Sequence, residues 1–531
     1  MKAWQLLLLL PLCSKTSAFL TQSTKRGVVS RPPSAVSSLH TKKRETRSLP
    51  NAPALQASTI SGGDIIDTQH ENDIIKSSIY VGAITALMGF IYGKVLGVSV
   101  NMVWTILPNL IIQRLGSINP ALFITGICTT GGLLLGLLSL KYSATFTVAD
   151  FVSLFSAAWG AETLPSCAVH LLPLLLLSLV TSAFGFSVGP EAPMVCAGAL
   201  VGASLSRHWY GSNDTGHQET LAYAGAAGAL TAFMGIPIAG SIFALELTRS
   251  NGGLSMSGGK ALVPSIISSI SAITIIRAIL LPNQAVGGHF TYGAVGALSG
   301  RAMMLVACAC GAGGAVLGTI FHRLVAMMKH VAWSTNTVKD GKSSWKRPLI
   351  VKTMIGLIVG IISTNYPQTL FWGEGSLQMM VDGQKTAFIA TKHGLSDILT
   401  SAARVNPSLP FDNASAAVQV GVAKLISIAL ACAGKFPGGI IFPLFFAAAP
   451  FVHAFSSVIG SNLVPVAVIC LMGATQASVT RTPLATVLML TLTASSTTEM
   501  SVMLPACMVS SYLGVFFSRL LSDKSYFGYK E

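Results

Sequence analysis

Charged residues are scarce in this chain of 531 residues. Lys, Arg, Asp and Glu together make up 10% of it, only 19 residues are acidic, and 51% are hydrophobic. Soluble domains carry about 25% charged residues, so the composition excludes an ordinary soluble domain and favours a membrane protein. The 51 glycines are typical of membrane helices that pack closely or are interrupted.

The sequence motifs of common enzyme and cofactor sites are also missing. The nine cysteines form no CxxC pairs with zinc spacing, and Cys308 and Cys310 suit packing better than metal binding. The ten histidines form no HExxH, and Gly341-Lys342-Ser343 lacks the upstream glycine of a phosphate loop. We therefore expect no enzyme activity, no cofactor and no metal site.

Positive charge is concentrated at the N-terminus. The formal net charge is +15, and residues 1–50 hold nine Lys or Arg against a single acid, Glu45. More than half of the excess therefore precedes the apolar body, which argues against nucleic acid as a partner and for a targeting sequence.

The N-terminus has the pattern of two targeting signals in series. Residues 1–18 combine Lys2, a short leucine run and small residues, as a signal peptide does, and residues 19–58 are rich in Ser, Thr and basic residues, like a transit peptide. This order predicts a plastid membrane, thylakoid or inner envelope. An ordinary secretory signal with a basic tail, and hence an endomembrane location, is the alternative. Residues 59–78 form a polar lead-in.

The body of the chain, residues 79–521, predicts an all-α polytopic membrane protein. Several of its apolar segments are shorter than the ~20 residues that cross a bilayer, so we expect tilted, broken or re-entrant helices lining a cavity. The expected segments are 79–100, 102–113, 121–140, 168–187, 193–208, 219–233, 237–248, 260–281, 303–328, 349–365, 416–433, 440–459, 463–476, 483–495 and 501–521. Polar loops are expected near 209–218, 329–348 and 373–415, and residues 522–531 form a short tail.

Glu191 is a carboxylate within apolar sequence, which is costly at membrane depth and usually marks function. Its neighbours Gly189, Pro190 and Pro193 cannot lie inside a regular helix. We expect one helix to end there and another to begin, with Pro193 in its first turn. A helix N-terminus attracts anions, so an acid beside it predicts a gate.

Two Gly/Pro patterns recur at nearly one offset. Residues 189–193 (GPEAP) and 439–443 (GIIFP) share a Gly-x-x-x-Pro form 250 positions apart, and Pro237 and Pro483 are 246 positions apart. The repetition predicts a duplication with halves of about 79–283 and 303–521. Interrupted segments at matching places in two halves indicate a binding site near the membrane midplane.

These motifs resemble the CLC family of chloride channels and transporters. The resemblance rests on residues 187–194 (SVGPEAPM), 232–246 (AFMGIPIAGSIFALE), 434–443 (GKFPGGIIFP) and 480–485 (TRTPLA), and covers about 79–527. The Gly-Pro-Glu variant resembles the plastid and cyanobacterial branch. The resemblance implies inverted halves, a homodimer in the membrane and a separate pathway for chloride, and possible passage of nitrate, in each subunit.

The resemblance also implies the roles of individual residues. Glu191 would be the gating glutamate, whose carboxylate competes with the anion. Backbone groups around two helix starts would cradle dehydrated chloride, because several oriented donors bind an anion without the tight hold of a full positive charge. The residues concerned are Gly189, Pro190, Ala192, Gly439, Ile440, Ile441 and Phe442.

Two further anion-binding positions are less well matched to the family pattern. The central serine falls at Ser143, although the usual Gly-Ser-Gly-Ile-Pro motif is missing, and a serine bonding locally at a helix end is the alternative. The inner tyrosine falls at Tyr526, with Tyr529 second. A tyrosine at the membrane interface is the alternative interpretation there.

Leu247 is the main departure from the family's exchangers. They carry a second, proton-transferring glutamate immediately after the position of Glu246, and leucine cannot hold a proton. We expect Glu246 itself to accept hydrogen bonds from backbone. The sequence thus favours an anion channel over a proton-coupled chloride/nitrate antiporter of the same fold, with a cation-coupled transporter as a remoter alternative. Without CBS domains in the sequence, nucleotide control through them is not expected.

Overall fold

The protein is described by a computed structural model that covers residues 62–142, 147–154, 167–211, 214–250, 260–280, 290–293, 299–334, 346–386, 408–494, 500–522 and 526–528. The chain divides into two units, residues 1–72 and 73–531. The predicted targeting segments 1–18 and 19–58 lie outside the described residues. All contacts below are within the second unit.

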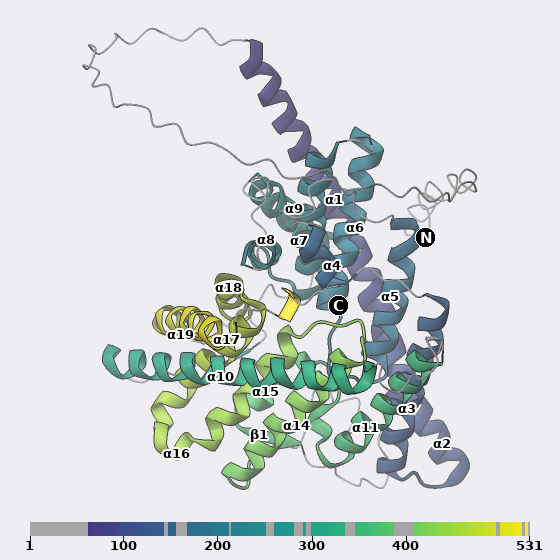
Figure 1. The fold of residues 1–531 in the computed structure, drawn as a ribbon, viewed down its shortest axis with the longest axis vertical. Helices are drawn as coiled ribbons and strands as arrows, with labels where there is room; N and C mark the ends of the chain where they lie inside the picture. The colour runs from purple at the N-terminus through teal and green to yellow at the C-terminus, as the bar shows by residue number, and fades with distance from the viewer. Residues whose placement is uncertain are drawn as a thin grey trace, which may run out of the picture. The chain divides into compact units, whose positions relative to one another are not determined.

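The described chain is almost entirely helical (Figure 1). The α-helices of the first half are α1 (Gly62–Asn101), α2 (Leu107–Leu115), α3 (Pro120–Lys141), α4 (Val148–Leu154), α5 (Cys167–Ala183), α6 (Glu191–Tyr210), α7 (Thr215–Met234), α8 (Ala239–Ser250) and α9 (Leu262–Ile275). Those of the second half are α10 (Gly300–Trp333), α11 (Arg347–Asn365), α12 (Leu377–Val381), α14 (Ala414–Ala433), α15 (Ile441–Ala454), α16 (Ser456–Ile459), α17 (Val464–Thr480), α18 (Pro483–Thr493) and α19 (Met500–Leu521).

Short elements connect these helices. The π-helices are η2 (Met102–Ile106) and η5 (Ile276–Leu280), and the 3-10 turns are η7 (Pro367–Thr369), η8 (Glu374–Ser376), η9 (Ser461–Leu463) and η10 (Tyr526–Gly528). Strands β1 (Gln384–Thr386) and β2 (Ser408–Pro410) form one antiparallel pair, with Lys385 opposite Leu409. This pair is a small exception to the predicted all-α class, which is otherwise confirmed.

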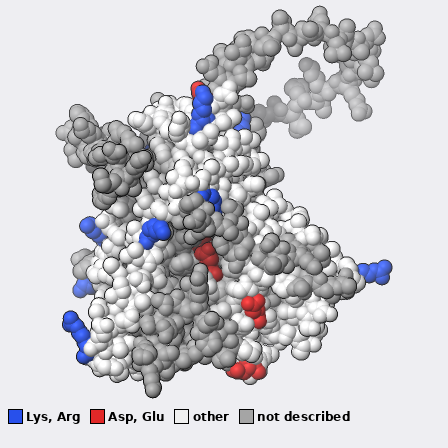
Figure 2. All heavy atoms as spheres, turned by 180° about the vertical axis from the view of Figure 1, so that it is seen from behind, with Lys and Arg blue, Asp and Glu red and all other residues white. Residues whose placement is uncertain are grey.

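Within the part of the chain that the structure describes, eight helical segments are long and apolar enough to cross a membrane, by length and composition. Four shorter apolar helices, including α15 and α18, lie among them. Figure 2 shows one face of the molecule, on which most of the described surface is uncharged and the charged side chains are few and scattered. The mixture of full spans and short helices confirms the predicted polytopic architecture with broken helices.

Two of the predicted segments differ most clearly from the structure. The segments expected at 79–100 and 102–113 are one continuous apolar stretch within Asn72–Leu115, because the π-turn η2 carries the chain from α1 into α2 without a break. Part of the loop expected at 373–415 is ordered as η8 and α12, and both pack against α15. Leu377, Met379 and Met380 are buried there, because α12 packs against α15, a contact that the local sequence does not reveal.

The two halves pack their helices in the same order. In the first half α6 contacts α5 and α7, and α7 contacts α8 and α9; in the second half α15 contacts α14 and α17, and α17 contacts α18 and α19. Contacts between the halves join matching helices, α3 with α11 and α8 with α18. This pattern confirms the predicted duplication.

The duplication extends to individual backbone angles. Gly185 and Lys435, 250 positions apart, both have positive φ (82° and 55°) and follow the ends of α5 and α14. The backbone N–H of each next residue, Phe186 or Phe436, donates to the carbonyl oxygen five positions earlier in the chain. The centroids of these two rings lie 4.6 Å apart in an edge-to-face arrangement. Gly235 and Arg481 end α7 and α17 in the same left-handed conformation. Lys435 and Arg481 adopt it without being glycines, so tertiary contacts impose these turns.

Glycines let α6 and α7 approach closely. A Cβ built on Gly198 would collide with the carbonyl oxygen of Gly225, and one built on Gly225 would collide with that of Gly198. Small residues at such crossings are how membrane helices pack without a hydrophobic driving force between them. The crossing fixes α6, and therefore the position of Glu191 at its first turn.

A second contact between the halves holds α18. The Glu246 side chain of α8 accepts hydrogen bonds from the backbone N–H groups of Leu484 (3.1 Å) and Ala485 (2.8 Å), in the first turn of α18. Those N–H groups have no partner within their own helix. Glu246 thus caps a helix of the other half, which confirms its expected structural role.

We expect Gly225→Ala to destabilise the protein by about 1–3 kcal/mol, because the added methyl group forces α6 and α7 apart. Thermal unfolding of the detergent-solubilised protein measures the change. Gly93→Ala is the matched control: a Cβ at Gly93 meets nothing within 4 Å, and helix propensity alone predicts a slight gain. Equal melting temperatures for the two variants would contradict the close crossing.

We expect Glu246→Ala to cost about 2 kcal/mol, because two helix-terminal N–H groups lose a charged acceptor. Glu246→Gln keeps an oxygen in place and should lose less. The comparison is made by thermal unfolding, with anion flux measured on both variants. A large loss of anion flux without any loss of stability would instead indicate a role in transport.

Candidate functional site

The two repeated Gly-x-x-x-Pro motifs meet through their first glycines. Gly189 and Gly439 form an antiparallel bridge in which each N–H donates to the other's carbonyl oxygen, with 2.9 Å from Gly189 N to Gly439 O. Equivalent residues of two repeats can pair reciprocally in this way only when the segments run in opposite directions past each other. The bridge therefore places α6 and α15 so that both begin at the same place.

The starts of α6 and α15 supply backbone donors there. Both helices have proline as their third residue, Pro193 and Pro443, which has no N–H to leave unsatisfied. The remaining amides that a helix leaves without an intrahelical partner belong to Glu191, Ala192, Ile440, Ile441 and Phe442. Of the predicted anion-binding residues, Gly189 and Gly439 use their N–H groups on each other, and Pro190 has none.

The Glu191 carboxylate lies over the bridge. A Cβ built on either Gly189 or Gly439 would collide with its oxygens, so only glycine at both positions leaves it room. Glu191 is 0% exposed, and neither carboxylate oxygen has a hydrogen-bond partner on another described residue. An acid buried in this way is costly, and it occupies the space toward which the helix starts point.

Hydroxyl groups lie near this carboxylate. Tyr92 of α1 hydrogen-bonds through its OH to Ser178 of α5 at 2.9 Å, and it interacts electrostatically with Glu191. Tyr92 packs with Met194, one turn along α6 from Glu191. These groups give the wall beside Glu191 a polar patch within apolar surroundings.

A connecting segment between α11 and α12 is fastened to the loop that precedes Glu191. The N–H of Phe371 donates to the carbonyl oxygen of Gly185 at 3.0 Å, and the Ser187 hydroxyl donates to that of Thr369. The segment 369–374 is therefore held against residues 185–187 by two hydrogen bonds.

Lys424 of α14 binds the same segment, residues 369–371, from within the protein. It is 0% exposed, and its Nζ donates to the carbonyl oxygens of Thr369 (3.1 Å) and Phe371 (2.7 Å) and lies 4.7 Å from the centre of the Phe446 ring. Among the described residues no carboxylate forms an ion pair with it. Carbonyl dipoles and an aromatic face stabilise the cation in place of an acid.

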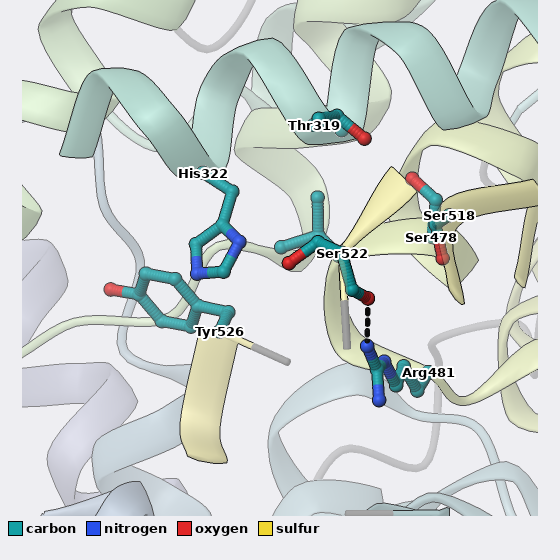
Figure 3. A pocket seen from close by; sticks show the side chains of 9 residues that line it. Thr319, His322, Ser478, Arg481, Ser518, Ser522 and Tyr526 are labelled. Carbon is teal, nitrogen blue, oxygen red and sulfur yellow. Dashed lines mark hydrogen bonds between the residues drawn. The ribbon is translucent and has the colours of Figure 1, made fainter. Parts of the chain in front are cut away.

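The structure describes only one of the two less well matched anion-binding positions, Ser143 and Tyr526. Ser143 lies outside the described residues. Tyr526 of η10 lines a small pocket with His322 and Arg481, and Arg481 donates to the carbonyl oxygen of Ser522 at 2.8 Å (Figure 3). Tyr526 packs at the edge of the apolar cluster that contains Val188 and Ile440. Since η10 also contacts α4, Tyr526 lies near the helix that follows the Ser143 segment, and its anion-binding role stays a prediction.

Leu247, at the position of the missing proton glutamate, is 0% exposed within the main apolar cluster.

The described residues include no group of three His, Cys, Asp or Glu side chains placed to hold a metal ion.

Two charged residues near the site were not selected from the sequence. Lys424 had the same signal as Glu191, an ionisable side chain within an apolar run. Glu374 had none, because it lies in a stretch that its composition marks as a polar loop.

Comparisons with known proteins agree with this architecture. A family model described as voltage gated chloride channel matches residues 131–515. Chloride channel protein CLC-f of Arabidopsis thaliana is 27% identical over 213 residues, which are 39% of this chain and only 25% of the plant protein's length. The putative ion-transport protein YfeO of Shigella flexneri is 24% identical over 375 residues, 70% of this chain and 75% of the bacterial protein.

Solved structures share the fold at low sequence identity. A slow cyanobacterial Cl-/H+ antiporter has a TM-score of 0.65 at 15% identity, covering 86% of this chain and 96% of the antiporter. A CLC-type fluoride/proton antiporter has a TM-score of 0.59 at 16% identity, covering 88% of this chain and 98% of that structure. The family match spans Glu191, the glycine bridge and both repeated motifs, and the chain therefore belongs to the voltage gated chloride channel family, the CLC channels and transporters.

Proposed function

We propose that this protein is a chloride-selective anion channel of the CLC type, gated by Glu191. The carboxylate occupies the space at the starts of α6 and α15, where an anion would meet the backbone donors. When Glu191 is ionised it excludes the anion by occupying its place and by charge repulsion. When it is protonated or turned away, the N–H groups are available to chloride.

The burial of Glu191 over the glycine bridge carries this proposal. A carboxylate that is 0% exposed and has no hydrogen-bond partner on another described residue is poorly stabilised where it lies. It therefore gains little from staying there in its ionised form. Helix-terminal amides stabilise a negative charge, and chloride can replace the carboxylate at them without adding a fixed charge to the protein.

Leu247 supports a channel over an exchanger. Its side chain is buried among apolar residues and cannot transfer a proton from the opposite side. The proton-coupled antiporter remains the second candidate, because the structures that share this fold include Cl-/H+ and fluoride/proton antiporters. For this chain to work as an antiporter, another acid or ordered water would have to replace the missing glutamate.

We propose a homodimer in a plastid membrane, thylakoid or inner envelope. The targeting pattern of residues 1–58 supports the location, as does the similarity to a plant channel protein and to a cyanobacterial antiporter. In such a membrane an anion channel would dissipate membrane potential and balance ions.

Chloride efflux from proteoliposomes, recorded together with external pH, tests the function. We expect efflux without stoichiometric proton movement from the protein lacking residues 1–58. In Glu191→Ala the efflux at neutral pH should rise roughly tenfold, which corresponds to about 1.4 kcal/mol of competition for the site, and should no longer respond to acid.

Coupled proton uptake would make the protein an antiporter and overturn the argument from Leu247. Glu246→Gln, which leaves Glu191 in place, serves as the control for general effects of removing a partly buried acid. Loss of all anion flux from a monodisperse, folded protein would overturn the proposed function itself.

A further inference from the structure

We propose that Glu374 is a second acid of the gate, a partly exposed carboxylate whose charge acts on buried Glu191 and sets the pH at which the anion pathway opens. This inference rests on the proposed function of Glu191. It adds a positioning residue from a part of the chain that lies more than 180 positions away.

The position of Glu374 follows from how its segment is held. Hydrogen bonds from Phe371 to Gly185 and from Ser187 to Thr369 bind the segment to the loop that leads into α6. Gly373 then turns the chain with a φ of 93°, and a Cβ there would lie 3.0 Å from the Phe446 side chain. Since only glycine accepts this conformation and this contact, the backbone direction into Glu374 is fixed.

Trp372 orients the carboxylate. Its Nε1–H donates to Oε2 of Glu374 at 2.9 Å, and its ring packs against the cluster that contains Ala183 and Met194. Met194 belongs to the first turns of α6, the helix that begins with Glu191. The tryptophan therefore connects the second acid to the helix that carries the first.

The two acids differ in access to solution. Glu191 is 0% exposed, whereas Glu374 is partly exposed. The hydrogen bonds between residues 369–371 and 185–187, and the packing of Trp372 with Met194, place Glu374 near the start of α6, where its charge would act on Glu191. Two like charges in a poorly solvated region disfavour simultaneous ionisation. Glu374 can gain or lose a proton at the surface and thereby change the free energy of ionised Glu191.

Burial raises the pKa of Glu374 above its ordinary value, and the Trp372 hydrogen bond opposes this rise. The Trp372 N–H favours the charged carboxylate. Trp372→Phe should accordingly leave Glu374 neutral over a wider range of pH.

Other ionisable groups adjoin the pair. Tyr92 of α1 interacts with Glu191, and Lys424 of α14 holds the backbone of the Glu374 segment from the opposite side. The C-terminal half of α5 and the first turns of α15 contribute only apolar and hydroxyl side chains. Lys424 donates to the carbonyl oxygens of Thr369 and Phe371, and it is unchanged in every variant below.

The sign of the pH effect follows from the repulsion. With Glu374 ionised, the charged form of Glu191 is disfavoured, so Glu191 takes up a proton, and the pathway opens, at a higher pH. With Glu374 neutral, Glu191 stays ionised to a lower pH. Neutralising Glu374 should thus move the midpoint of acid-activated anion flux downward.

The test measures chloride efflux from proteoliposomes as a function of pH. In Glu374→Gln we expect the midpoint to fall by about one pH unit, with maximal flux at low pH retained. Trp372→Phe should shift the midpoint in the same direction by less. Asp382→Asn is the matched control, because Asp382 follows in the same connection but bonds to Gln378; its midpoint should equal that of the wild type.

A double variant separates an effect on Glu191 from a direct effect on the pore. In the Glu191→Gln background, Glu374→Gln should cause no further change in the pH profile. An unmoved midpoint in Glu374→Gln, with flux intact, overturns this inference and leaves the proposed function standing. A shift that persists in the Glu191→Gln background also overturns it. Absence of anion flux from the wild-type protein would instead overturn the proposed function.

Discussion

The reciprocal hydrogen bonds between Gly189 and Gly439 are the constraint on which the rest of the site depends. Two helices are interrupted within an apolar protein, and interrupted backbone there must find partners. Each break supplies the partner for the other. Because both residues lack a side chain, the Glu191 carboxylate fits over the pair, and because the segments are equivalent, α6 and α15 begin on the two sides of one point.

The charges near this point are balanced in an unusual way. Buried ions are ordinarily paired with opposite charges, yet Lys424 is held by two carbonyl oxygens and an aromatic ring, while Glu191 has no partner on another described residue. A cation satisfied by dipoles remains in place. A carboxylate with no hydrogen-bond partner on another described residue can change its protonation or position more readily, which is the property that a gate requires.

The repeat could be predicted from the sequence, because its two motifs are marked by proline and glycine residues. Proline lacks the N–H group that a helix interior needs, and glycine destabilises a helix interior through its backbone freedom. GPEAP and GIIFP therefore predict two helix starts from the local sequence alone. Gly185 and Lys435 show the limit of that argument. A lysine in a left-handed turn carries no local signal, and only comparison with its glycine counterpart in the folded protein explains it. The position of Glu374 was equally hard to predict. The composition of its segment indicates a loop, and its packing against α15 is visible only in the folded protein.

The sequence by itself determined the membrane class, the places where helices break, the duplication and the acid at the start of α6, because these depend on local composition and on residues that restrict their own backbone. Only the tertiary structure decided that the two breaks pair with each other and that residues 369–374 lie against the loop before Glu191. It likewise decided that Glu246 caps a helix of the other half. These contacts join positions 180 to 250 residues apart. They form because buried polar groups need hydrogen-bond partners, and no short stretch of sequence can supply these alone.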